Sequence, residues 1–484
     1  MHTSKGLGSS STTTQEPKLG HSMSPRQLTM MGLGSAIGAG LFIGSGAGVQ
    51  AAGPAVLISY LVAGTLIIIV MWALGEMAAA NPNSGAFSVY TGKALGGVAG
   101  ATVGWLWWAQ LVVVIAAEAL GAAGLLATVF PALPVWLMAL VFMGVFTAVN
   151  LTGVRNFGEF EFWFALLKVT AIVVFLLIGA ALLLGWIPNA ASPGLGHFTA
   201  AGGFAPHGMA GIATGLFVVV FAFGGTEIVS VAAAETRDPE RSVARAVRTV
   251  VWRILVFYVG SIFVIAAVIP SDSPEIKSPF AGVLDIAGLP AAATVITLVA
   301  VVALLSALNA NLYGASRMIF SLAERQEAPS ALRRLTGARV PAIAVAASVA
   351  FGFIATVLEL LFPEHVLPLL LNFVGSTCLV VWGSALVSQI VLRRRADAAG
   401  TRLPLRMAGF PWLSGFGVLL LAAIFLVGLI GEDSRIQLLS TFALVAAIAL
   451  AAWLGRRARA RQTEFATSGD GAVETDIAVQ NQHS

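Results

Sequence analysis

The run GSAIGAGLFIGSG, from Gly34 to Gly46, decides how this chain folds. It lies inside an apolar segment at residues 28–50, which is long enough for a helix to cross a lipid bilayer. Glycine in a helix interior costs about 1 kcal/mol relative to alanine, so Gly38-Ala39-Gly40 predicts a break at mid-membrane. Unwound backbone is tolerated at that depth only beside protein or a water-filled cavity. The run therefore predicts a broken helix that borders a cavity.

The composition places the whole chain in the membrane. Of its 484 residues, 58% are hydrophobic and 10% are charged, whereas a soluble domain carries about 25% charged residues. The fold class is therefore an all-α membrane protein, with a short amphipathic helix near 279–287. Twelve apolar segments approach the length that a spanning helix needs: 28–50, 55–79, 99–128, 133–152, 160–186, 208–234, 249–269, 291–322, 341–362, 366–391, 410–430 and 435–454.

The basic residues predict the orientation. With twelve spans both termini lie on one side, and all but three of the 27 Lys and Arg residues then fall on that side. The exceptions are Lys168, Lys277 and Arg435. Because cytoplasmic loops are enriched in Lys and Arg, we expect a multi-pass protein of the inner cell membrane with both termini in the cytoplasm. The net charge of +4 thus reflects the lipid bilayer as a partner, and not nucleic acid.

The two ends of the chain are polar, whereas its middle is apolar. Residues 1–24 and 458–484 are polar, and we expect disordered cytoplasmic tails flanking a transmembrane domain at 25–457. The one cysteine, Cys378, cannot form an internal disulfide or a cysteine metal cluster. We find no catalytic constellation, so we expect no enzyme activity, no metal, no cofactor and no obligate protein partner.

A second broken helix is predicted at FAFGGTEIVS, from Phe221 to Ser230, where Gly224-Gly225 interrupts the segment at 208–234. The two breaks begin two five-helix blocks of opposite orientation, about 25–190 and 205–395, with two further helices at about 410–455. This layout is typical of an inverted repeat with a binding site between discontinuous helices. The alternative is that these glycines only allow close helix packing.

Broken helices offer partners for both charges of a zwitterion such as an amino acid. Free N–H groups at a half-helix start attract a carboxylate, and free carbonyls at a half-helix end attract an ammonium. The expected donors are the amides of Ala39, Gly40 and Leu41, and the expected acceptors are the carbonyls around Ser35 to Ile37 and those of Phe221 and Ala222. Thr226 is an expected N-cap of the second half of its helix. The predicted substrate-binding residues are Ser35, Ala36, Ile37, Gly38, Ala39, Gly40, Leu41, Glu118, Phe221, Ala222, Phe223, Gly224, Gly225 and Thr226.

Three ionisable residues are candidates for proton coupling, because charges inside a bilayer are costly and are usually functional. Glu118 could bind a proton, hold a substrate ammonium, or form a structural hydrogen bond. Lys168 could exchange a proton or extend to the cytoplasmic surface. Glu227 could couple a proton or complement the dipole of its half-helix. Phe221 and Phe223 could cover the substrate or pack in the core.

Polar residues nearer the cytoplasmic side suggest other roles. We expect Glu76, Glu235 and Arg317 to form a salt-bridge network that closes this side. Asn309 and Asn311 could satisfy broken backbone or line the substrate path.

Several long runs together resemble the amino acid transporter family of the amino acid–polyamine–organocation superfamily, over residues 24 to 455. They are GSAIGAGLFIGSG at 34–46, GEMAAANPNSGAFSVY at 75–90, GEFEFWFALLKV at 158–169, FAFGGTEIVSVAAAETRDPE at 221–240 and NANLYGASRMIFSLAERQEAP at 309–329. The run VVWRILVFYVGSIFVIAAVIP at 250–270 is especially similar to 4-aminobutyrate (GABA) permeases.

The resemblance implies uptake of GABA or another small neutral amino acid by proton symport and alternating access. It places Gly38, Ala39 and Gly40 at the substrate carboxylate and Glu118 at the substrate or the proton. A lysine at the position of Lys168 stands in place of a sodium ion in related proton-coupled carriers, which favours protons over sodium. GABA permeases tend to carry a larger residue at the position of Gly224, whereas aromatic and other neutral amino acid permeases share the double glycine. Permeases for aromatic amino acids, proline or other amino acids, and amino acid or amine exchangers, are thus alternatives.

Overall fold

The computed structural model describes residues 37–83, 85–152, 157–188, 190–199, 202–226, 239–336, 340–363 and 365–480. Every regular element within these ranges is a helix, and none of their residues lies in a strand. The predicted all-α class is therefore confirmed for the described part of the chain.

Nine helical runs in the described ranges are long and apolar enough to cross a membrane, and two shorter apolar helices accompany them. The first run, Ala39–Ala80, contains α2 (Ala39–Phe42), α3 (Gly44–Ala52) and α4 (Val56–Ala80), and so covers the second predicted segment and the part of the first from Ala39 onward. Gly53, with a φ of +63°, and Pro54 separate α3 from α4. A left-handed φ suits glycine, and proline suits the first turn of the next helix.

Each later predicted segment matches one helix or one helical run. The seventh segment corresponds to the end of α11 (Pro239–Arg253), a π-helical stretch η3 (Ile254–Val259) and α12 (Gly260–Val268). Two short helices lie between the long ones, α5 (Ala86–Leu95) and, as predicted, α13 (Pro279–Ile286). The others are α6 (Gly97–Val129), α7 (Val135–Thr152), α8 (Phe157–Leu183), α9 (Gly208–Phe223), α14 (Pro290–Glu324), α15 (Ala342–Leu361), α16 (Val366–Ala398), α17 (Trp412–Gly428) and α18 (Glu432–Gln480).

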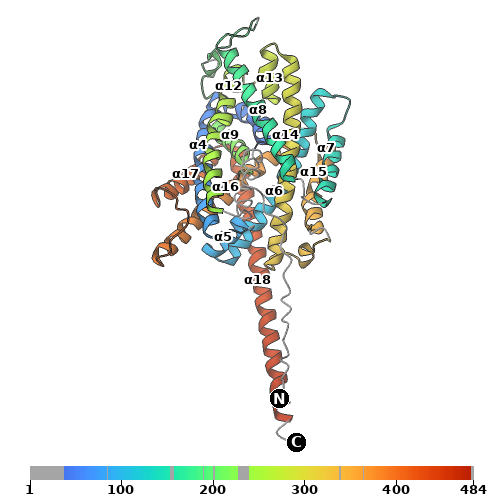
Figure 1. The fold of residues 1–484 in the computed structure, drawn as a ribbon, viewed down its shortest axis with the longest axis vertical. Coiled ribbons are helices and arrows are strands. Elements are labelled where there is room, and N and C mark those ends of the chain that lie inside the picture. Colours follow the sequence, from blue (N-terminus) through green and yellow to red (C-terminus); the bar gives the residue numbers. More distant parts are fainter. Residues whose placement is uncertain are drawn as a thin grey trace, which may run out of the picture.

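The helices form one bundle around α6 and α14, the pair with the most extensive contact (Figure 1). The two run antiparallel, because Gly104 of α6 lies against Leu322, and Gly121 lies against Leu304. In the most apolar part of α6, 72% of the residues are buried, against 22% in α7 and 11% in α18. Exposed apolar side chains on α7 and α18 suit a lipid environment, so the core lies along α6 and the outer helices surround it.

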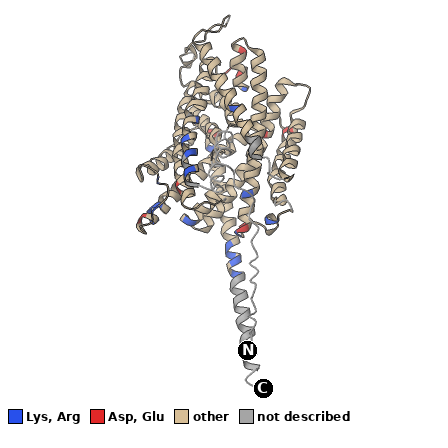
Figure 2. Ribbon diagram, in the orientation of Figure 1, with Lys and Arg blue, Asp and Glu red and all other residues tan. Residues whose placement is uncertain are grey.

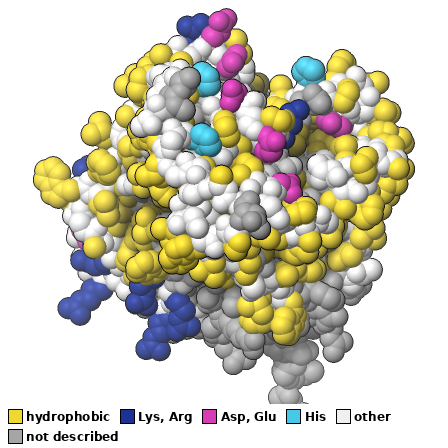
Figure 3. Space-filling view, turned by 90° about the horizontal axis from the view of Figure 1, so that it is seen from above, with side chains coloured by type: hydrophobic (Ala, Val, Ile, Leu, Met, Phe, Trp, Pro, Cys, Tyr) yellow, Lys and Arg dark blue, Asp and Glu magenta, His cyan; other side chains and the backbone are white. Residues whose placement is uncertain are grey.

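Basic residues are more frequent at one end of the bundle than at the other. Most of the Lys and Arg residues coloured in Figure 2 lie toward the end from which α18 projects. Asp, Glu and His side chains appear on the opposite face (Figure 3). This distribution agrees with the asymmetry of basic residues seen along the sequence.

The C-terminal end differs from the expected disordered tail. The structure continues α18 as a helix to Gln480, past the predicted boundary at residue 458. Alanine and arginine have high helix propensities, and the segment 456–461 (RRARAR) continues α18 directly after Gly455, with no proline to stop the helix. The predicted tail at 1–24 lies outside the described residues.

Candidate functional site

The first break is a helix start at Ala39. Gly38 is extended, with φ −144° and ψ −148°, and α2 begins at the next residue. The Ala39 N–H donates to Oε2 of Glu118 at 2.9 Å, and the Leu41 N–H donates to the Gly38 carbonyl at 3.1 Å. Of the three predicted anion donors, Ala39 therefore meets a carboxylate, and Leu41 is used within the chain. Ser35 and Ala36 lie outside the described residues, and Ile37 is fully buried beside the break.

The second break is the end of α9. The helix stops at Phe223, Gly224 leaves it with ψ 149°, and Gly225 has a φ of +90°, which favours glycine. The Gly224 N–H donates to the Phe221 carbonyl at 2.9 Å. The Thr226 hydroxyl donates to the Phe223 carbonyl at 2.9 Å, so in the described part Thr226 caps the end of α9. Glu227 lies outside the described residues.

The two breaks face each other across a very short distance. A Cβ placed on Gly40 would lie 2.4 Å from the Cα of Ala222 in α9. A Cβ placed on Gly38 would lie 2.4 Å from Oε1 of Glu118 and 2.9 Å from the Cβ of Ala307 in α14. Gly38 and Gly40 therefore allow close helix packing, as one of the two interpretations of the sequence expected, and the binding-site interpretation stays a prediction.

A small cavity of about 10 Å³ lies between the breaks. A space of this size can hold about one water molecule, so the structure is closed around its site. Seven of the predicted binding residues line the cavity, and so do two residues that were not among them, Val114 and Asn311. The lining is Gly38, Gly40, Val114, Glu118, Phe221, Ala222, Gly224, Gly225 and Asn311.

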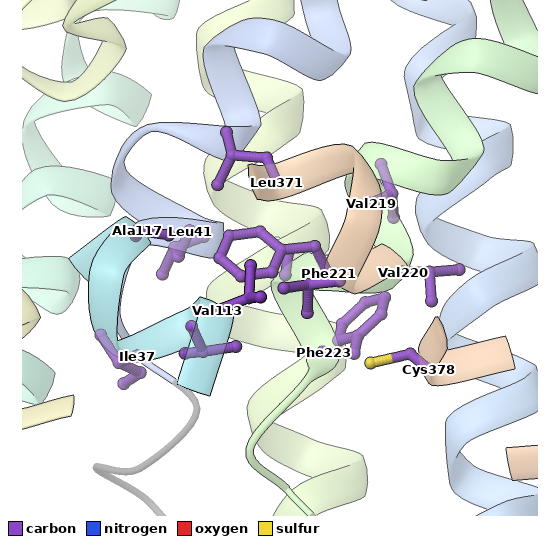
Figure 4. Packing of buried hydrophobic residues seen from close by; sticks show 14 of the residues in the cluster. Ile37, Leu41, Val113, Ala117, Val219, Val220, Phe221, Phe223, Leu371 and Cys378 are labelled. Atoms are coloured by element: carbon purple, nitrogen blue, oxygen red, sulfur yellow. The ribbon is translucent and has the colours of Figure 1, made fainter. Parts of the chain in front are cut away.

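The two phenylalanines at the end of α9 point in different directions. Phe221 lines the cavity, and its ring reaches toward α3, 3.7 Å from a Cβ placed on Gly44. Phe223 packs between Tyr258 and Tyr60, with ring centroids 4.9 and 5.8 Å apart. Figure 4 shows the Phe223 ring near Cys378, apart from that of Phe221. Only Phe221 is therefore placed to cover a substrate.

Glu118 and Lys168 are both buried, with exposed fractions of 4% and 0%. The Lys168 ammonium donates to the Ser306 hydroxyl of α14 at 3.0 Å and interacts electrostatically with Glu118. A side chain with no exposed surface does not extend to the cytoplasm, so the alternative for Lys168 is wrong in this structure. Lys168 instead connects α8 to the helix that packs against Gly38.

Charged groups pair at the end of the bundle toward α18. Glu76 of α4 pairs with Arg393 of α16 at 2.5 Å, and it also accepts from Gln389 at 3.0 Å. The predicted network of Glu76, Glu235 and Arg317 stays a prediction; Arg317 stacks on the ring of Tyr313, with its guanidinium carbon 3.2 Å from the ring centroid. Glu235 lies outside the described residues. Side-chain spacing along the sequence does not specify which of several basic helix ends meets Glu76.

Aromatic rings pack together around α13. Phe280 of α13 packs against Phe42 and Phe175, with centroids 4.8 and 4.5 Å apart. The backbone of Ile276 lies against Gly46 of α3, where an added Cβ would come within 2.0 Å of its carbonyl oxygen. Ion pairs thus join α4 to α16 at the end toward α18, and ring contacts join α13 to α2 and α8 elsewhere in the bundle.

The sequence could have identified Val114 as a cavity residue. It named Asn311 as a candidate but could not distinguish it from Asn309. Val114 precedes Glu118 by four residues, so the two share one face of α6. Asn309 and Asn311 were equivalent candidates on α14. The structure separates them, because the side-chain Oδ1 of Asn309 accepts from Nδ2 of Asn150 in α7 at 2.7 Å, whereas Asn311 lines the cavity.

The described helices thus form a membrane bundle with a small buried cavity between the start of α2 and the end of α9. The amino acid permease family model matches residues 27–463, and the chain belongs to this family. It is 45% identical to an aromatic amino acid transport protein of Corynebacterium glutamicum, over 87% of this chain and 92% of the relative. It is 41% identical to a GABA permease of Bacillus subtilis, over 93% and 97%, and 38% identical to a GABA permease of Escherichia coli, over 88% and 92%. The protein is thus a multi-pass permease of the cell membrane.

Proposed function

We propose that this permease imports a zwitterionic amino acid together with a proton, by alternating access. The observation that carries the proposal is the hydrogen bond from the Ala39 N–H to the Glu118 carboxylate. A carboxylate already binds at the start of α2, where a helix terminus favours negative charge. A substrate carboxylate would take this place.

Competition for one amide couples the substrate to the proton. With Glu118 ionised, its own carboxylate occupies the Ala39 amide. A proton on Glu118 removes the negative charge and weakens this bond, since hydrogen bonds to charged groups are the stronger ones. The amide is then free to bind the incoming carboxylate, so substrate and proton bind together. Lys168, held by Ser306, provides the positive charge that the ionised Glu118 faces after proton release.

The topology is proposed with twelve spans and both termini in the cytoplasm. The run Ala39–Ala80 then counts as parts of two spans, and the short helices α9 and α17 count as one each. Blocks 25–190 and 205–395 form the inverted repeat, with broken helices at α2 and α9. The ion pair at Glu76 then closes the cytoplasmic side and the rings at Phe280 close the outer side.

The substrate is GABA or another small neutral amino acid. An aromatic amino acid is the second candidate, favoured by Gly224-Gly225 in the cavity wall and by the aromatic amino acid transport protein among the relatives. A permease for proline or other amino acids, and an exchanger that works independently of the proton gradient, are the remaining alternatives.

Reconstituted protein in proteoliposomes tests the proposal. We expect radiolabelled GABA or a neutral or aromatic amino acid to accumulate under an inward proton gradient, and a protonophore to abolish the accumulation. Counterflow without accumulation would identify an exchanger. If no amino acid of the panel moves in either assay, the proposed function is wrong.

A further inference from the structure

Asn311 is a buried polar residue of the cavity that the proposed coupling does not use. It is 3% exposed, and its Nδ2 donates to the Ala307 carbonyl one turn earlier in α14, at 2.8 Å. A backbone carbonyl can only accept, so the amide nitrogen is fixed against the helix. Asn311 lines the cavity, and its side-chain oxygen is the atom left to accept a hydrogen bond from a ligand there.

The cavity has two levels along the axis of the bundle. Ala307 packs against Gly38 and Glu118 lies beside the same glycine, which defines the first level. Asn311 follows Ala307 by four residues, and Val114 precedes Glu118 by four in the antiparallel α6. Four residues of helix rise by about 6 Å, so Asn311 and Val114 form a second level, one turn away.

Amino acids of different length place their ammonium at different levels. An α-amino acid carries its ammonium one carbon from the carboxylate, so both charges stay beside Gly38 and Glu118. An ω-amino acid such as GABA has three methylene groups between the charges, about 5 Å at bond lengths near 1.5 Å. With its carboxylate at Ala39, its ammonium reaches the level of Asn311.

We infer that Asn311 determines whether the site accepts ω-amino acids, because its side-chain oxygen accepts a hydrogen bond from the distal ammonium of the substrate. The inference rests on the proposed function, since it requires an amino acid in this cavity. A site that hydrogen-bonds a substrate group rejects molecules that leave its polar atoms unpaired, and the same bond is lost when the protein partner is removed. A hydrogen bond to a charged group corresponds to about 10- to 100-fold in affinity.

The test compares Asn311→Leu with Asn309→Leu in reconstituted full-length protein. The Leu side chain is close to Asn in size but lacks the acceptor oxygen. Asn309 lies two residues away and faces α7, so it controls for a general effect on α14. We expect Asn311→Leu to raise the KM for GABA by about 10- to 100-fold and that for phenylalanine by less than about threefold. Asn309→Leu is expected to leave the ratio of the two KM values unchanged.

A second variant covers the case in which Asn311→Leu does not fold. Asn311→Asp keeps acceptor oxygens and adds a negative charge, so it should improve GABA relative to phenylalanine by about threefold or more. Equal changes for both substrates, or a shift toward phenylalanine in the Asp variant, would overturn the inference and leave the proposed function intact. A wild-type protein that binds phenylalanine but no ω-amino acid would also overturn the inference alone. A wild-type protein that binds no amino acid at all would overturn both the inference and the proposed function.

Discussion

At the start of α2 a side chain from another helix satisfies the broken backbone, whereas at the end of α9 the chain satisfies itself. Glu118 of α6 accepts the Ala39 N–H. At the second break, the Gly224 amide and the Thr226 hydroxyl donate to carbonyls of the preceding turn. A bond from a distant carboxylate can be exchanged for a bond to a ligand without unwinding the helix. The bonds at the end of α9 are local and hold the shape of the cavity wall.

We therefore expect the first break to exchange the hydrogen-bond partner of the Ala39 amide, and the second break to keep a fixed backbone conformation. Substitutions at the first break should change transport and its dependence on protons. Substitutions at the second should change stability more than coupling. Substitutions at the contact between Gly40 and Ala222, where the two breaks meet, should change both transport and stability.

Gly40→Ala should have the largest effect, because it removes the contact on which both breaks depend. The added methyl group would lie 2.4 Å from the Cα of Ala222, a backbone atom that cannot rotate away. We expect transport at background level and a loss of stability of about 3 kcal/mol or more. Gly44→Ala is the matched control, since the nearest atoms of other residues would lie 3.7 Å from the added methyl group. Uptake by the Gly40 variant equal to that of the Gly44 variant would show that the breaks do not pack this closely.

Glu118→Gln should separate binding from coupling. Glutamine keeps an oxygen that can accept the Ala39 N–H but cannot exchange a proton near neutral pH. Concentrative uptake should disappear, while exchange across a symmetric membrane continues. The measurement is uptake and counterflow at several pH values. Normal accumulation with unchanged proton dependence would remove Glu118 from the mechanism.

Lys168→Ala should change the response to protons with a smaller effect on folding. The variant loses a buried charge and its bond to Ser306, so Glu118 no longer faces a fixed cation. We expect uptake that is uncoupled from the proton gradient or strongly slowed, by about tenfold or more, as for the loss of a buried charge partner. Ser306→Ala, which leaves the lysine in place, should show a weaker form of the same change. Wild-type coupling in both variants would assign Lys168 a structural role.

Thr226→Val should have the smallest effect, and it should lower stability without changing the proton dependence of transport. It removes the hydroxyl that caps α9 but keeps the shape of the side chain. Stability should fall by about 1 kcal/mol, and proton dependence should stay as in the wild type. A thermal denaturation scan and a pH series of uptake rates check the two parts. A shifted pH dependence would mean that the second break also takes part in coupling.

The breaks themselves could be predicted from the sequence, because the cost of glycine in a helix is local. Gly38 and Gly224 lie where the helices begin and end in the structure. The residue types of the site were also predictable in part, because a carboxylate in an apolar helix rarely occurs without a function. The directions of Phe221 and Phe223 were not predictable, since the turn at the end of α9 decides which ring faces the cavity.

The partners of the charged and polar residues also lay beyond the sequence. Glu76 meets Arg393, which is 317 positions away, although several other basic residues were equally possible. Lys168 is buried against Ser306 rather than extended to the surface. Hydrophobic pattern and local propensity carry no information on which distant side chain completes such a pair.

The sequence by itself determined that this is a helical membrane protein, with helix termini at Gly38 and Gly224 and a carboxylate inside an apolar helix. These properties follow from apolar length, glycine placement and the cost of burying charge, which act along the chain. Only the tertiary structure decided that Glu118 binds the Ala39 amide, that Asn311 and not Asn309 lines the cavity, and that Glu76 pairs with Arg393. These properties depend on how helices far apart in the chain pack, and packing fixes the distance and direction of each side chain.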